Sequence, residues 1–158
     1  MASTAPPGST GASLRFKALN WIGIVDQLAT TKANRVLDAI GLPMPQFVLL
    51  NHFSHRPGLP RTVTGIAAAF QQQQPGVTKT VQKLLDKGYL RTESDPGDGR
   101  VRQLFLTEAG ARAHEAARAS LAPLLADAFI GWSDEEVGQL VALLDRLRIY
   151  LDANRDPA

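Results

Sequence analysis

The sequence predicts a mainly α-helical protein with one small β-hairpin, an α+β fold with long helices at both ends of the chain. Three observations lead to this prediction. Apolar residues recur at helical spacing along most of the chain, glycines and prolines mark where the helices stop, and a cluster of turn residues at 94–99 separates two short segments of strand composition.

Composition limits both the size and the class of the protein. A chain of 158 residues with 44% hydrophobic and 20% charged residues is expected to form one packed unit with helical extensions. The absence of cysteine excludes disulfides, thiolate zinc sites and cysteine-based redox sensing. Neither a signal peptide nor a membrane span is recognisable, so we expect a cytoplasmic protein with no membrane partner.

The first helical region covers residues 13–60. A long helix is expected over residues 14–40, where Gly41 and then Pro43 stop the apolar pattern. A short amphipathic helix should follow over residues 45–55, before a segment rich in proline and glycine.

The second region, residues 61–106, begins with two short helices. Thr62 is a plausible N-cap for a helix over residues 63–70, and the glutamines 71–74 form a polar connection. Pro75 opens the next helix and Gly88 ends it at the C′ position. Two short helices joined by a tight polar turn are typical of a helix-turn-helix.

Strands are expected at residues 89–93 and 101–106, where they should form a hairpin beside the helix pair.

The third region, residues 107–152, is again helical. Thr107 caps an alanine-rich helix that Pro123 should kink or break near residues 119–123. A final helix starts at the capping box Ser133–Glu136, and its apolar seam consists of Val137, Leu140, Val141, Leu144, Leu147 and Leu151. Residues 1–12 and 153–158 are expected to be tails, the first of them disordered.

Five segments of residues 62–110 follow one another in a fixed order: Thr62-Val-Thr-Gly-Ile-Ala67, Gln74-Pro-Gly-Val-Thr-Lys79, Leu84-Leu-Asp-Lys-Gly-Tyr-Leu90, Asp95-Pro-Gly-Asp-Gly-Arg100 and Leu106-Thr-Glu-Ala-Gly110. Together they resemble the DNA-binding core of the MarR family of winged helix-turn-helix transcription regulators. It implies a winged helix-turn-helix flanked by N- and C-terminal dimerisation helices.

The recognition helix of such a protein places its N-terminal half in the major groove, where hydrogen-bonding side chains are needed. Gln74, Thr78 and Lys79 meet that need, and Lys83 lies one turn beyond Lys79. The alternative is an ordinary solvated basic face on the helix.

In the family's wing, an aspartate and an arginine stand one residue apart and the arginine enters the minor groove, whose narrow A·T-rich form attracts positive charge. Asp98 and Arg100 match these positions. The simpler alternative is that Asp98 only caps a turn and that Arg100 is solvated. Gly76 and Gly99 depart from the family, since a hydroxyl residue is common at the first position and a second wing arginine at the other, so their effect on affinity is open.

Two further sites come into question. Trp21, Phe47, Leu50 and Phe53 resemble the walls of a cleft in which relatives bind small aromatic acids, although aromatics at helical spacing are also typical of core. His52, His55 and His114 do not predict a metal site, because no Asp or Glu lies between Asp38 and Asp86.

The sequence therefore predicts a homodimeric regulator, most simply a repressor, that binds a pseudo-palindromic operator in double-stranded DNA and is released by a small aromatic or phenolic ligand. No cofactor is expected. No catalytic constellation is present, so an enzyme is not expected. The alternative is a helical protein-interaction module that has lost specific DNA binding.

Overall fold

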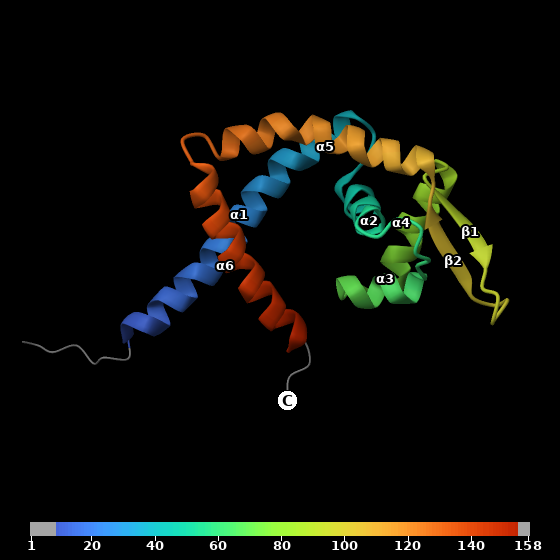
Figure 1. Ribbon diagram of the computed structural model, residues 1–158, viewed down its shortest axis with the longest axis horizontal. Coiled ribbons are helices and arrows are strands. Elements are labelled where there is room, and N and C mark those ends of the chain that lie inside the picture. The colour runs from blue at the N-terminus through green and yellow to red at the C-terminus, as the bar shows by residue number, and fades with distance from the viewer. Residues whose placement is uncertain (1–8, 155–158) are drawn as a thin grey trace, which may run out of the picture. The chain divides into compact units, whose positions relative to one another are not determined.

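The computed structural model describes residues 9–154, which form helices and one two-stranded antiparallel sheet (Figure 1). This confirms the predicted mainly α class with a β-hairpin wing. Contacts divide the chain into two compact units, one reaching to Leu121 and the other starting at Ala122. The elements of the described residues are α1 (Ser9–Ala39), α2 (Met44–Ser54), α3 (Val63–Phe70), α4 (Gln74–Asp86), β1 (Leu90–Ser94), β2 (Arg102–Leu106), α5 (Glu108–Ala128) and α6 (Asp134–Ala153).

Helix α1 begins earlier than predicted. It starts at Ser9, so residues 9–12, which the sequence places in the N-terminal tail, are helical. Each of these small residues costs a helix about 1 kcal/mol or less, which a helix of 31 residues tolerates at its end. The rest of that tail, and residues 155–158 of the C-terminal one, lie outside the described residues.

The helix pair α3 and α4 forms as the capping residues predict. The Thr62 hydroxyl accepts a hydrogen bond from the Gly65 N–H at 3.1 Å, which satisfies one of the free donors at the start of α3. Gln71 takes the left-handed conformation, with φ 51°, and reverses the chain. The predicted connection of four glutamines is one residue too long, because Gln74 already belongs to α4.

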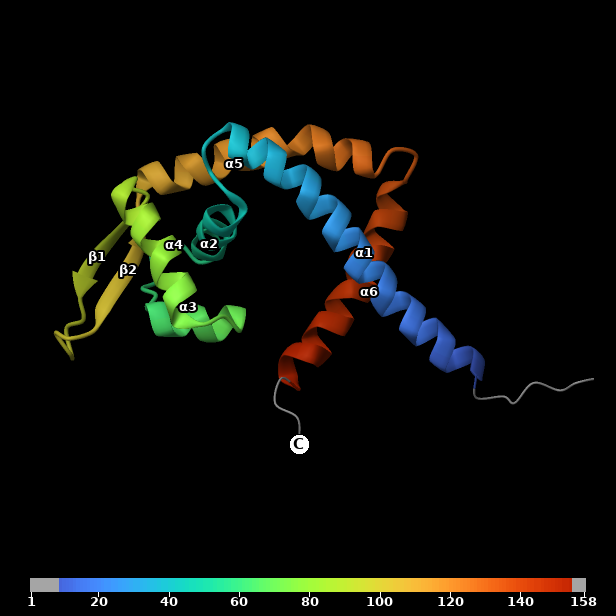
Figure 2. The ribbon, with the colours of Figure 1, turned by 180° about the vertical axis from the view of Figure 1, so that it is seen from behind.

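The hairpin pairs Leu90 with Leu106 and Thr92 with Leu104. Leu104 is buried on the face that meets α2, and its backbone also bonds Arg61 in both directions, at 2.7 and 3.0 Å. Figures 1 and 2 show α2, α3, α4 and the hairpin grouped together. The predicted strands start one residue early, since Val101 closes the turn by bonding Asp98.

Helix α5 opens where Thr107 caps it. The Thr107 hydroxyl accepts from the Gly110 N–H at 3.0 Å and donates to the Gly88 carbonyl at 2.7 Å. Of the kink or break expected near residues 119–123, the break does not occur, because α5 continues to Ala128 with Pro123 inside it. Pro123 and Ala119 are exposed, so the carbonyl that loses its helical donor faces water and one missing bond does not end the helix.

The core of the first unit collects side chains from α1, α2, α3, α4 and both strands, with Leu37, Leu50, Phe53, Ile66, Leu84 and Leu104 fully enclosed. In the second unit, α6 carries the predicted capping box, with Ser133 and Glu136 bonding each other's backbone N–H. No residue of α6 is buried. None of the helices over residues 9–154 is both long and apolar enough to cross a membrane.

Candidate nucleic-acid interface

Helix α4 separates its apolar and polar residues onto two faces. Val77, Val81 and Leu84 are buried against the rest of the lobe at the three- and four-residue spacing of a helix. The opposite face is exposed to solvent and carries all four recognition-helix residues predicted from the sequence. A shallow surface hollow there is lined by Gln74, Pro75, Thr78, Lys79, Gln82 and Lys83.

Two of these side chains are held in place by the helix-turn-helix itself. The Gln74 amide donates to the Thr64 hydroxyl of α3 at 3.2 Å, which ties the start of α4 to the preceding helix. The Thr78 hydroxyl donates to the Gln74 carbonyl at 2.9 Å. Lys79 and Lys83 are exposed, and their ammonium groups form no hydrogen bond or ion pair with other described residues. The face therefore presents amide, hydroxyl and ammonium groups to a partner that carries many hydrogen-bond acceptors.

The wing turn is organised by two aspartates. Asp95 accepts from the backbone N–H groups of Gly97 and Asp98, at 2.8 and 3.0 Å, and from the Gln103 side chain. These bonds, the one from Gly97 most of all, lower the pKa of Asp95. Asp98 in turn accepts from the Arg100 backbone N–H at 3.0 Å. Asp98 therefore shapes the turn, while the Arg100 guanidinium stays exposed.

Sequence reasoning missed a further cation of the hairpin. Arg102 is exposed, and its guanidinium donates to the hydroxyls of Ser94 and Thr92, at 3.2 and 2.7 Å. The signal was available, because alternation along a hairpin puts residues 92, 94 and 102 on one face. Arg102 adds a second positive group to a wing in which Gly99 leaves one position without a side chain.

The four residues predicted to wall a ligand cleft have different surroundings. Leu50 and Phe53 are enclosed in the core, with exposures of 0% and 2%. Phe47 stacks on His114, with 5.5 Å between ring centroids, and Trp21 is exposed on α1. The helical spacing of Phe47, Leu50 and Phe53 marked the inward face of α2, which a sequence pattern does not distinguish from a cleft wall.

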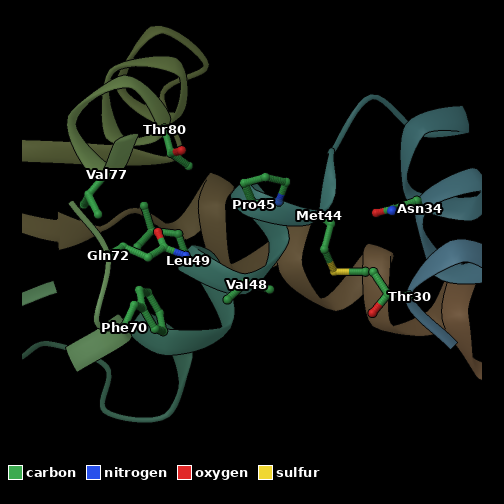
Figure 3. Close-up of a pocket in the computed structure, with 10 residues that line it drawn as sticks. All are labelled: Thr30, Asn34, Met44, Pro45, Val48, Leu49, Phe70, Gln72, Val77 and Thr80. Atoms are coloured by element: carbon green, nitrogen blue, oxygen red, sulfur yellow. The ribbon is translucent and has the colours of Figure 1, made fainter. Parts of the chain in front are cut away.

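A different pocket, of about 330 Å³, lies within the first unit. Figure 3 shows side chains of α1, α2 and α4 and of the end of α3 converging on it. Its lining is mainly apolar with a few amides and hydroxyls, and consists of Thr30, Asn34, Met44, Pro45, Val48, Leu49, Phe70, Gln72, Val77 and Thr80.

The histidines have protein partners. The His114 Nε2 lies 3.0 Å from the Asn51 amide oxygen, and the Asn51 amide nitrogen lies 3.3 Å from the His55 Nε2. His52 packs edge-on against Phe70, with 5.0 Å between ring centroids. Over residues 9–154 no group of three or more His, Asp or Glu side chains is arranged to hold a metal ion.

Comparison with known proteins places this geometry in context. Residues 40–101, which run from the end of α1 through the wing turn, match the MarR family model. None of the curated proteins compared with the sequence matches it.

Solved structures match over nearly the whole chain. Wild-type MarR from E. coli, in its apo form, superposes with a TM-score of 0.71 at 20% identity, covering 92% of this chain and 98% of that one. The transcriptional regulator BldR from Sulfolobus solfataricus gives 0.69 at 22% identity, covering 85% and 97%. A mutant of S. aureus MepR, bound to an oligodeoxyribonucleotide, gives 0.59 at 22% identity, covering 85% and 97%. The chain therefore has the winged helix fold of these proteins.

Proposed function

We propose that the chain is a MarR-family transcription regulator, since residues 40–101 match that family model and the fold is that of MarR and BldR, and that it represses transcription as a homodimer on a pseudo-palindromic operator. The observation that carries this proposal is the outward face of α4. Gln74, Thr78, Lys79 and Lys83 stand on it together, on a helix whose other face is fixed in the core. The MepR mutant with a bound oligodeoxyribonucleotide has the same fold.

In the proposed complex, α4 enters the major groove with its N-terminal half foremost. Lys79 then reaches base edges, where an ammonium donates to the guanine N7 and O6 acceptors. The Gln74 side-chain oxygen is left as an acceptor for a base edge, since its amide nitrogen donates to the Thr64 hydroxyl. Lys83, one turn farther along, meets phosphate, which contributes affinity without base preference.

The wing reaches the neighbouring minor groove. Asp98 holds the backbone of Arg100, so the guanidinium projects from a turn of defined shape. A narrow minor groove concentrates negative potential, and one guanidinium there responds to groove width more than to base identity. Arg102, beside it, is suited to the flanking phosphates.

The terminal helices supply the proposed dimer interface. On α1, Leu14, Phe16, Leu19, Val25 and Leu28 are all more than half exposed. On α6, no side chain is buried and Val141, Ile149 and Leu151 are more than half exposed. Apolar faces of this extent in a folded chain mark association surfaces, and a two-fold pair is the commonest solution. A dimer also matches the two half-sites of a pseudo-palindrome.

Ligand release is the remaining part of the proposal. The pocket of Figure 3 is a better candidate than the four residues first predicted, because its walls come from α1, α2 and α4 at once. A small aromatic molecule seated there would push α4 relative to α1 and so misplace the recognition helix. A DNA-binding role also implies action in the cytoplasm.

The experiment that separates this function from a protein-interaction module is a salt series. Fluorescence anisotropy measures binding of the purified protein to a labelled 30-base-pair duplex pool of random sequence between 50 and 200 mM NaCl. A protein that neutralises several phosphates loses about a thousandfold in affinity or more over such a range. A flat response, or no binding at 50 mM, favours the interaction module.

A further inference from the structure

Lys87 links three parts of the first unit that are distant in sequence. It is the C-cap of α4, and its ammonium donates to the Gly41 carbonyl at 2.6 Å and to the Gln46 side-chain oxygen at 2.7 Å. Gly41 lies in the turn after α1, and Gln46 stands in the first turn of α2. One side chain therefore connects the end of the recognition helix to the corner between α1 and α2.

Both acceptors are held in place by their surroundings. Gly41 has φ +70°, a left-handed conformation that suits glycine. The Leu42 N–H, which shares a planar peptide unit with the Gly41 carbonyl, donates to the Leu37 carbonyl at 3.0 Å, so the direction of the Gly41 carbonyl is fixed. Gln46 is only 5% exposed and its backbone N–H bonds the Pro43 carbonyl at 2.8 Å. A bond from an ammonium to a neutral oxygen is charge-assisted and stronger than one between neutral groups.

The opposite end of α4 has a weaker tie to its surroundings. There the side-chain link is the Gln74–Thr64 bond, between two neutral groups at 3.2 Å, whereas the bonds of the exposed Lys87 are shorter and charge-assisted. Apart from the buried row of Val77, Val81 and Leu84, the stronger polar anchor of the helix is thus at its C-terminal end. Together with the buried row, an anchor at this end fixes the direction in which the other end points.

We propose that Lys87 is a positioning residue for DNA recognition, which sets the direction of α4 relative to α1 and thereby the separation of the two recognition helices in a dimer. This rests on the proposed function, since α1 carries part of the proposed dimer face. Lys87 does not reach DNA in this role. It acts through the placement of Lys79 and its neighbours in each half-site.

The first test needs no operator. Hydrogen exchange of the amides at residues 84–89 is compared between the wild type and Lys87→Met, which keeps the stem and removes the ammonium. We expect exchange there to become at least tenfold faster. Lys32→Met, which removes an exposed lysine of α1 that forms no ion pair or hydrogen bond within residues 9–154, should leave it unchanged. Unchanged exchange in Lys87→Met overturns the anchor.

The second test uses a duplex selected from a random library by the wild-type protein. One base pair is then inserted or deleted between the half-sites, which moves them apart or together and rotates them relative to each other. The wild type should lose at least tenfold in affinity for either altered spacing. Lys87→Met should bind the selected spacing more weakly and discriminate the three spacings by less than threefold.

Other roles for Lys87 give other results. A direct phosphate contact predicts weaker binding to a duplex with a single half-site and a lower salt slope, whereas the positioning role leaves both unchanged. A purely structural role predicts a lower Tm with the wild-type spacing preference intact. Gln46→Glu keeps an acceptor for the ammonium and should keep the spacing preference. If the wild type selects no sequence, the proposed function fails, and the exchange experiment still decides on the anchor.

Discussion

The Asp98 carboxylate accepts a hydrogen bond from the backbone N–H of Arg100 at 3.0 Å, and no bond joins the two side chains among the described residues. The aspartate therefore shapes the wing and leaves the guanidinium free for a partner. We expect Arg100→Ala to weaken binding of the selected duplex about tenfold, roughly the loss of one charge-assisted contact, with the Tm unchanged because the wing tip packs little.

Asp98→Ala is expected to weaken binding as well, by disordering the turn that presents Arg100. Anisotropy titrations and thermal melts of both variants check this, with Arg35→Ala on α1 as a matched loss of one exposed arginine. Wild-type affinity in Arg100→Ala would rule out the minor-groove role.

Gly110 is required at the start of α5. A Cβ at this position would lie 2.2 Å from the Tyr89 carbonyl oxygen and 2.8 Å from Leu106 Cδ1. We expect Gly110→Ala to lower the free energy of unfolding by about 1–3 kcal/mol, since the nearest atom is backbone and must move. Urea denaturation measures the change.

Gly76 provides the control, because nothing lies within 4 Å of a Cβ added there. Gly76→Ala should raise the stability of α4 by up to about 1 kcal/mol. Equal stability of Gly110→Ala and the wild type would show that the α5 start is not packed as described.

Stability should fall in mild acid. Burial lowers the pKa of His114, and the charge of Arg118 lowers it further, while Glu115 opposes this. The unfolded chain, with a histidine pKa near 6.5, then takes up the proton before the folded one does. The contribution of His114 is therefore fully present above pH 6.5 and is lost as the pH falls through the lower, folded-state pKa.

His52 has its pKa lowered in the same direction, mainly by burial, and adds to the effect. Urea denaturation at a series of pH values from 7.5 to 4.5 measures it, and His114→Gln should reduce the slope. A stability that rises on acidification would contradict the described surroundings of His114.

The terminal helices should make the protein a dimer. Sedimentation at micromolar concentration should give twice the chain mass of 17.0 kDa. Val141→Glu places a charge on an apolar face of α6 and should shift the protein toward monomer, whereas Arg146→Glu changes an exposed charged position of the same helix and should not. A wild type that stays a monodisperse monomer would refute the dimer.

The features that sequence predicted well depend on local chemistry. Thr62 caps α3 and Ser133 caps α6 because each side-chain oxygen lies within reach of N–H groups three residues away. The hairpin followed from its turn residues and from alternation. The turn-capping role of Asp98 and the exposed basic side of α4 were likewise among the alternatives that the sequence offered.

The features that sequence missed depend on long-range packing. Lys87 bonds Gly41, which is 46 residues away, and Gln46, which is 41 residues away. A side chain at position 110 is excluded by the Tyr89 carbonyl, which is also distant in sequence. Leu50 and Phe53 resemble cleft walls in sequence because periodicity marks an inward face without saying what it meets. The sequence did not show that α5 runs through Pro123, because the exposure of Ala119 to water is a property of the folded helix.

The most direct test of sequence-specific recognition by α4 is the affinity of the wild type and of Lys79→Ala for the selected duplex and for a scrambled duplex of the same composition. Lys83→Ala serves as the matched control, and circular dichroism checks folding. We predict that Lys79→Ala loses roughly 1–3 kcal/mol on the selected duplex and less on the scrambled one. Lys83→Ala should weaken both duplexes equally and lower the salt slope by about one unit. Equal binding of the two duplexes by the wild type, or equal losses on both in Lys79→Ala, would contradict base reading by this helix.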